Sequence, residues 1–117
     1  MQALVSAFLN SARGLRLAAR GERAVRQELL VFALALPLAA VLSDHMWTRI
    51  ALVGVLMVVV CAELLNTAIE KLADHVTAAH HPEIGRVKDM GSAAVGVSLL
   101  IAGFAWLLAL AEWAGFL

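Results

Sequence analysis

The amino-acid sequence predicts an all-α membrane protein that forms a single domain over residues 1–117. Hydrophobic residues make up 62% of the chain and the mean hydropathy is +0.87, whereas soluble domains are about 45–50% apolar. Long apolar runs alternate with short polar connections, and an amphipathic segment precedes the first run. We therefore expect an N-terminal surface helix followed by three transmembrane helices.

Residues 2–20 have the periodicity of a helix that lies flat on a membrane. Apolar residues such as Leu4, Phe8 and Leu15 recur at three- and four-residue steps, and polar residues occupy the other side. The segment is too polar to span a bilayer, and five arginines lie between positions 13 and 26. This combination is typical of a helix in the interface of an anionic leaflet.

Three apolar runs are long enough to cross a bilayer as helices, at about residues 25–43, 49–72 and 89–113. The first contains Pro37, which membrane helices tolerate, usually as a kink. It reaches the necessary length of about 20 residues only if flanking Arg and Glu side chains extend toward the interface.

Polar segments at residues 43–49 and 75–87 are expected to connect the spans as loops. Their charged and histidine residues have no spacing typical of a metal site, so we interpret them as solvated; they include Asp44, His45, His80 and His81. Beyond the second loop, Ser92 and Gly96 form a pair of small residues four positions apart. Such a pair predicts a close approach of helix backbones.

Basic residues are distributed asymmetrically about the predicted spans. Only Arg49 falls beside the first connection, and all other Lys and Arg residues fall on the side of the N-terminus and the second loop. The positive-inside rule then places the N-terminus in the cytoplasm. No basic block is interleaved with aromatic residues, so nucleic-acid binding is not expected.

The second span becomes acidic toward its end. Glu63, Asn66, Glu70 and Asp74 fall within an arc of roughly 80° on a helix, and Glu63 and Glu70 lie about 10 Å apart along its axis. An ionisable group at membrane depth costs at least about 2.5–3.5 kcal/mol, which marks this face as a functional-site candidate. Because a three-span chain has little interior, burying these acids is expected to need neighbouring copies of the chain.

Several further polar residues are expected at the same membrane surface: Glu22, Glu28, Lys88 and Asp89. Carboxylates suit Mg²⁺, which binds to one or two of them together with substrate phosphates. Glu63 is the deepest acid and is the candidate general base toward a lipid hydroxyl. Glu70 lies nearer water and suits the metal, and Lys88 can hold a phosphate as a point charge. No P-loop or protein-kinase signature is present, so a nucleotide site here would be of an unusual kind.

Three segments resemble signature segments of the small prokaryotic diacylglycerol kinases. ELLNTAIE is similar to the family's ELxNxAIE, GRVKDMGSAAV resembles GRxKDMGSAAV, and GLR followed by Glu and RQE resembles the approach to the first span. They stand at residues 63–70, 85–95, 14–16, 22 and 26–28. They occur in the family's order and run from about residue 13 to 96. The chain departs from the family in its surface helix, which lacks aromatic residues near positions 10–13 and contains no Tyr.

The resemblance implies an ATP-dependent kinase that phosphorylates the hydroxyl of diacylglycerol to give phosphatidic acid. It implies a homotrimer in the bacterial inner membrane, with active sites shared between subunits at the cytoplasmic surface. By the matched motifs, Glu63 would be the general base, and Asn66 would position other groups in the active site. Glu22 and Glu70 would hold Mg²⁺ with the ATP phosphates. The nucleotide site would include Lys88, Asp89, Glu28 and Arg13.

Three alternatives remain at this point. Undecaprenol kinases share the acidic signature and the architecture, although the KDMGSAA segment is more similar to the diacylglycerol branch. A proton- or ion-translocating subunit is a second alternative, because it also places a glutamate within a membrane helix; the clustering of acids toward one side argues against it. The third is a non-catalytic assembly protein, which would not need to bury three polar side chains.

Overall fold

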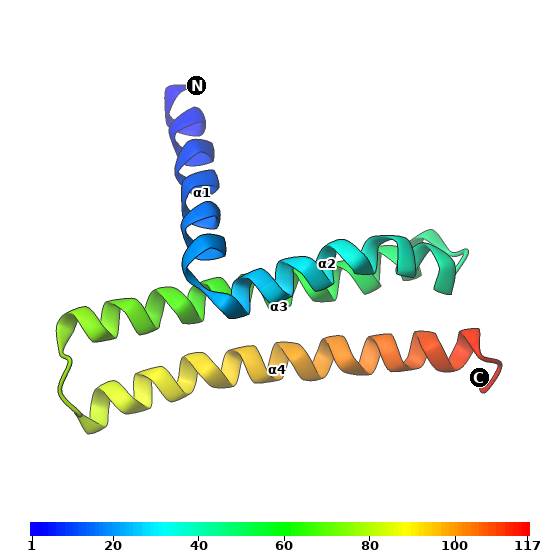
Figure 1. The fold of residues 1–117 in the computed structure, drawn as a ribbon. Helices are drawn as coiled ribbons and strands as arrows, with labels where there is room; N and C mark the ends of the chain where they lie inside the picture. The colour runs from blue at the N-terminus through cyan, green and yellow to red at the C-terminus, as the bar shows by residue number, and fades with distance from the viewer.

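The computed structural model describes residues 1–117, and the chain folds entirely as α-helices joined by short connections (Figure 1). The four helices, in chain order, are α1 (Gln2–Gly21), α2 (Arg23–Leu42), α3 (Met46–Val76) and α4 (Pro82–Trp113). Of these, α2, α3 and α4 are each long and apolar enough to cross a membrane. The predicted all-helical fold with three candidate spans is therefore confirmed.

Helices α2, α3 and α4 run side by side as a bundle, and α1 leaves the bundle at the α1–α2 corner and points away from it, transverse to its long axis (Figure 1). With 20 residues, α2 is about 30 Å long, which matches the hydrocarbon core of a bilayer. With 31 and 32 residues, α3 and α4 are each more than about 45 Å long. They therefore extend well beyond the α1–α2 corner, and their connecting loop lies past that corner (Figure 1).

The interior of the bundle is small. Only 13 of the 117 residues are buried, and the largest cluster joins Ala39, Leu52 and Ala109 from the three long helices. Trp106 packs against this cluster and donates from Nε1 to the carbonyl oxygen of Leu52 at 3.1 Å. No residue of α1 is buried. Most large apolar side chains face outward, as expected for helices whose surroundings are lipid or other helices.

The loop predicted at residues 75–87 is shorter in the structure, because α3 continues to Val76 and α4 begins at Pro82 instead of Asp89. Pro82 occupies the first turn of α4, where its missing N–H costs nothing. The His81 ring accepts a hydrogen bond at Nδ1 from the backbone N–H of Glu83 and so caps the helix. Polar residues here continue both helices, because a helix that leaves a bilayer no longer needs an apolar surface.

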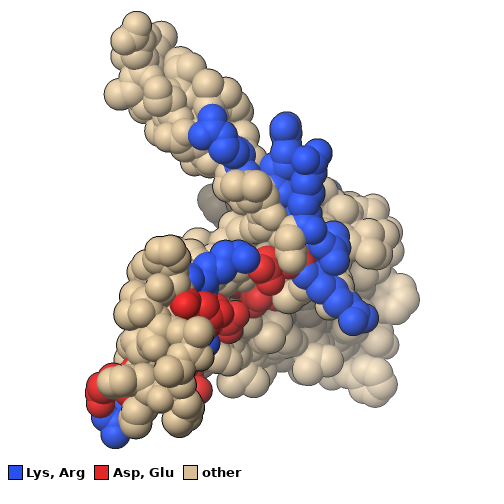
Figure 2. Space-filling model, turned by 60° about the vertical axis from the view of Figure 1, so that its left-hand side comes forward, with Lys and Arg blue, Asp and Glu red and all other residues tan.

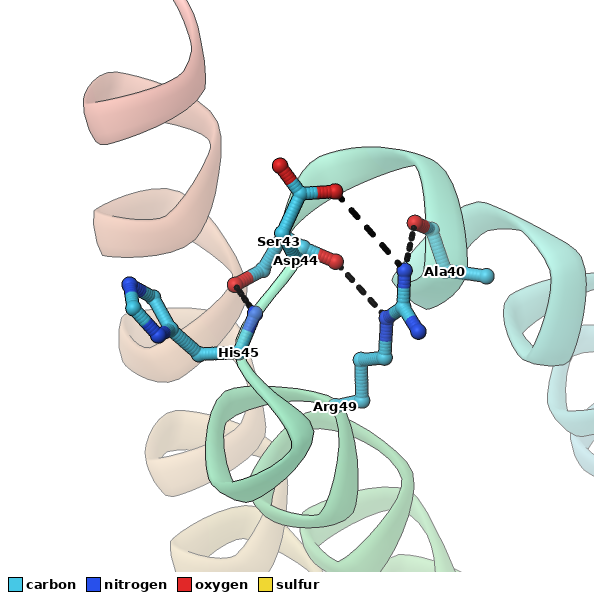
Figure 3. A network of polar contacts seen from close by, with 5 residues as sticks. All are labelled: Ala40, Ser43, Asp44, His45 and Arg49. Atoms are coloured by element: carbon cyan, nitrogen blue, oxygen red, sulfur yellow. Dashed lines mark hydrogen bonds and ion pairs between the residues drawn. The ribbon is translucent and has the colours of Figure 1, made fainter.

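The connection between α2 and α3 is also short, spanning residues 43–45 (Figure 3). Arg49 donates from Nε to the carbonyl oxygen of Ser43 at 2.7 Å and from Nη2 to that of Ala40 at 2.8 Å. It also pairs with Asp44 at 4.0 Å, and the Ser43 hydroxyl accepts from the backbone N–H of His45. These contacts satisfy carbonyl groups at the end of α2, which have no partner within the helix.

Candidate active site

The candidate site lies where the α1–α2 corner meets the later half of α3 and the first half of α4. Figure 2 shows acidic side chains gathered along the bundle beneath α1, with Lys and Arg side chains beside them. Lys71 of α3 pairs with Glu22 at the corner, with Nζ 2.9 Å from Oε1. The corner is therefore level with Lys71, and Glu63 lies about 12 Å further along α3 toward the middle of the bundle.

Four carboxylates are concentrated in this region. Glu70 and Glu22 act on the half-buried Glu63 by charge repulsion, and Glu63 acts in the same way on Glu28 of α2. Neither Glu63 nor Glu28 forms an ion pair, and Oε2 of Glu28 is buried without a hydrogen-bond partner. Desolvating a carboxylate that has no partner costs free energy, so a cation or a proton donor bound at this cluster would stabilise it.

Asn66 lies between this cluster and α4. The residue is only 8% exposed, and Nδ2 donates to Oε1 of Glu70 at 3.3 Å. Its Oδ1 is buried, has no hydrogen-bond partner, and faces Gly91 of α4. The sequence predicted close backbone approach at Ser92 and Gly96, but both are exposed and the close approach within the chain is at Gly91.

Two ion pairs that join separate parts of the fold were not predicted from the sequence. The first is the Lys71–Glu22 pair, and the second joins Lys88 Nζ of α4 to Asp74 Oδ1 of α3 at 2.5 Å. Asp74 and Lys88 lie at equal distances from residue 81 along the chain, which is the relation expected of partners in an antiparallel helix pair. The spacing of Asp74 and Lys88 therefore indicates the pair, but the prediction of a loop at residues 75–87 left no antiparallel helices there to compare.

Not every predicted site residue meets the acidic cluster within one chain. Arg13 lies on the exposed α1 and donates to Oδ1 of Asn10 at 3.4 Å. Asp89 is exposed and forms no ion pair, although it directly follows the paired Lys88. The structure thus brings together Glu22, Glu28, Glu63, Asn66 and Glu70, and it leaves Arg13 and Asp89 without contacts to them.

The carboxylates fit a magnesium ion that also binds phosphate. No three His, Cys, Asp or Glu side chains are close enough to hold a metal by themselves. Mg²⁺ commonly takes only one or two carboxylates and completes its shell with substrate phosphates and water. Glu22 pairs with Lys71, which directly follows Glu70 along α3, and both glutamates lie near enough to act on the charge of Glu63.

Apolar grooves adjoin the cluster beneath α1. One of about 790 Å³ separates α1 from α3, and its lining includes Gly14, Leu15, Leu64 and Lys71. A second of about 290 Å³ lies between α1, α2 and α3, with Leu15 and Leu64 again among its residues. Both grooves are lined by Leu64, which directly follows Glu63 along α3.

Comparison with known proteins gives a match that covers nearly the whole chain. Residues 9–110 match the family model described as prokaryotic diacylglycerol kinase. The chain is 38% identical over 107 residues to the diacylglycerol kinase of Escherichia coli (strain K12), covering 92% of this chain and 88% of that protein. It is 35% identical to the diacylglycerol kinase of Pseudomonas aeruginosa, over 91% of this chain and 86% of that protein. For the Haemophilus influenzae protein of the same name the identity is 33%, over 88% and 87%.

Proposed function

Because the chain belongs to the prokaryotic diacylglycerol kinase family, we propose that it transfers the γ-phosphate of ATP to the hydroxyl of diacylglycerol, giving phosphatidic acid. The single observation that supports this best is the cluster of carboxylates around Glu63, next to grooves suited to acyl chains. Acyl chains in these grooves would lie against apolar side chains of α1 and α3, among them Leu15 and Leu64.

In the proposed reaction Glu63 is the general base. Its carboxylate accepts the proton of the lipid hydroxyl while that oxygen forms a bond to the γ-phosphorus. The bond between this phosphorus and the β–γ bridging oxygen breaks, and ADP leaves with the electron pair. Glu63 suits this role because it forms no ion pair and lies deeper along α3 than Glu70. A positioned base contributes about 10²–10⁴ to a rate.

The other residues bind and orient the phosphates. Glu22 and Glu70 would hold Mg²⁺, which when bound neutralises charge on the phosphate oxygens. Asn66 orients Glu70 through the hydrogen bond from its amide. Lys88 would exchange its partner Asp74 for a phosphate, since an ammonium group binds either as a point charge. The nucleotide site would further include Glu28, Asp89 and Arg13.

We infer that the site is shared between subunits of a homotrimer, which is embedded in the bacterial inner membrane with its N-terminus in the cytoplasm. Two observations support shared sites: most apolar surface of the bundle is uncovered, and Arg13 and Asp89 do not meet the acidic cluster within one chain. The proposed orientation follows the positive-inside rule, and the exposed apolar face of α1 suits a helix that rests on the bilayer.

The experiment that tests this proposal compares two lipid alcohols. Purified protein in lipid vesicles with ATP and Mg²⁺ is offered diacylglycerol or undecaprenol, and the phosphorylated lipid is quantified. We expect phosphatidic acid as the preferred product and none after Mg²⁺ is chelated. Preferential phosphorylation of undecaprenol would make undecaprenol the substrate instead of diacylglycerol. If neither lipid were phosphorylated, the proposal of a lipid kinase would be refuted.

A further inference from the structure

Gly91 is the glycine at which an added Cβ would meet another side chain of the chain. A Cβ atom built on it would lie 2.5 Å from Oδ1 of Asn66 and 3.6 Å from Cδ1 of Ile69. At every other glycine of the chain, the added Cβ would meet nothing within 4 Å. Gly91 is itself buried on the face of α4 that packs against α3. The requirement for glycine here is therefore steric, and it involves one particular side chain.

The Asn66 amide has only one orientation that satisfies its neighbours. Glu70 is an acceptor when ionised, so Nδ2 must point toward it, and Oδ1 then points toward Gly91. The glycine hydrogen that replaces a Cβ is directed at this oxygen, which makes it a weak C–H donor. Without a side chain at position 91, the buried amide fits between α4 and Glu70.

We propose that Gly91 is a positioning residue for the phosphoryl-transfer site. Its missing side chain allows the Asn66 amide to donate to Glu70, and this hydrogen bond orients the Glu70 carboxylate. The proposal rests on the proposed function, in which Glu70 binds Mg²⁺ with the ATP phosphates. An added methyl group would displace the end of the Asn66 side chain, which can rotate, so the helices themselves need not separate.

The kinetic test compares Gly91→Ala with Gly96→Ala. Both changes add one methyl group to α4 and both favour the helix equally, but a Cβ on Gly96 meets nothing within 4 Å. We expect Gly91→Ala to reduce kcat/KM for Mg·ATP about tenfold or more, as for loss of a hydrogen bond to a charged group. Gly96→Ala should leave it unchanged.

A double-mutant cycle then separates positioning from packing. If Gly91 acts through Asn66, adding Gly91→Ala to an Asn66→Ala variant should change kcat/KM by less than about twofold. A loss as large as in the wild-type background would overturn the proposal, because it would show that the methyl group disturbs the helix pair whatever residue stands at position 66.

A spectroscopic readout makes the test independent of catalysis. The chain contains only two asparagines, Asn10 on the exposed α1 and Asn66, so labelling the asparagine side-chain nitrogen with ¹⁵N yields two pairs of side-chain amide signals, one pair for each residue. Gly91→Ala should shift the Asn66 signal and speed its hydrogen exchange, whereas Asn10 should not change; Gly96→Ala should affect neither. An unmoved Asn66 signal in Gly91→Ala would refute the contact.

If the wild-type protein phosphorylated no lipid alcohol, the proposed function would fail, and these signals would still decide the role of Gly91 toward Asn66.

Discussion

The two ends of the bundle both carry polar side chains, but they use them differently. At the α2–α3 turn, Arg49 donates to two backbone carbonyl groups, and the Ser43 hydroxyl accepts from the backbone of His45 (Figure 3). At the α1 end, one oxygen of Glu28 and one of Asn66 are buried without any hydrogen-bond partner. Polar groups at the turn are thus satisfied by the fold itself, whereas the α1 end also holds buried oxygens that the chain leaves without a hydrogen-bond donor.

The largest difference between the two ends should appear when a glutamate is neutralised at each. Glu63→Gln removes the proposed base and should lower kcat by about 10²–10⁴ while preserving the size of the assembly. The matched change Glu112→Gln, near the far turn, should leave kcat unaltered. Initial rates of phosphatidic acid formation and size-exclusion chromatography provide the two readouts. Full activity in the Glu63 variant would exclude it as the base.

Much of the α1 end could be predicted from the sequence because helical periodicity alone places Glu63, Asn66 and Glu70 together. The three candidate spans likewise follow from long apolar runs. The end of α3 and the start of α4 could not be placed in this way, because beyond the bilayer these parts of the helices have no apolar pattern to reveal them. Pro82 and the capping His81 were the available local signals for the start of α4.

Contacts between helices could be predicted from the sequence even less well than the helix ends. The Lys71–Glu22 pair and the contact of Gly91 with Asn66 depend on how far one helix is shifted along the other. Hydropathy does not determine that shift, since a lipid-facing helix tolerates many apolar residues at many positions. The small-residue pair Ser92 and Gly96 predicted close packing at the start of α4, and within one chain the close contact is made by their neighbour Gly91.

A smaller effect is expected at the turn, and it should concern stability alone. Arg49→Met removes the donors to Ala40 and Ser43 and should lower the free energy of unfolding by about 1–2 kcal/mol, since water can reach part of this site. The activity of the folded protein should not change. Thermal unfolding in detergent measures the change in stability, and kcat measures the activity of the folded protein. As a control, Arg23→Met removes an exposed arginine that makes no hydrogen bond or ion pair, and it should alter neither. A fall in kcat for Arg49→Met would contradict the division between the two ends.

The smallest effect is expected at Lys71, which occupies the proposed metal ligand Glu22. The side chains of this pair are 66% and 33% exposed, and such pairs contribute only about 0–1 kcal/mol. Lys71→Met should free Glu22 and reduce the Mg²⁺ concentration for half-maximal activity by about two- to fivefold. A magnesium titration of the initial rate measures this shift.

The matched control for Lys71 is Arg86→Met, which removes one positive charge from an exposed ion pair with Glu83. It should not change the magnesium requirement. If Lys71→Met raised that requirement instead of lowering it, Lys71 would be a supporting member of the site and not a competitor for its metal ligand.

The position of α1 has a consequence for how the proposed reaction should be described kinetically. α1 points away from the bundle (Figure 1), and the grooves beside it are lined by α1 and α3. In the proposed reaction, a lipid substrate for these grooves would arrive by lateral diffusion within the plane of the bilayer. ATP arrives from water in three dimensions. The two substrates therefore have different units of concentration: molarity for the nucleotide, and mole fraction among the surrounding lipids for the alcohol.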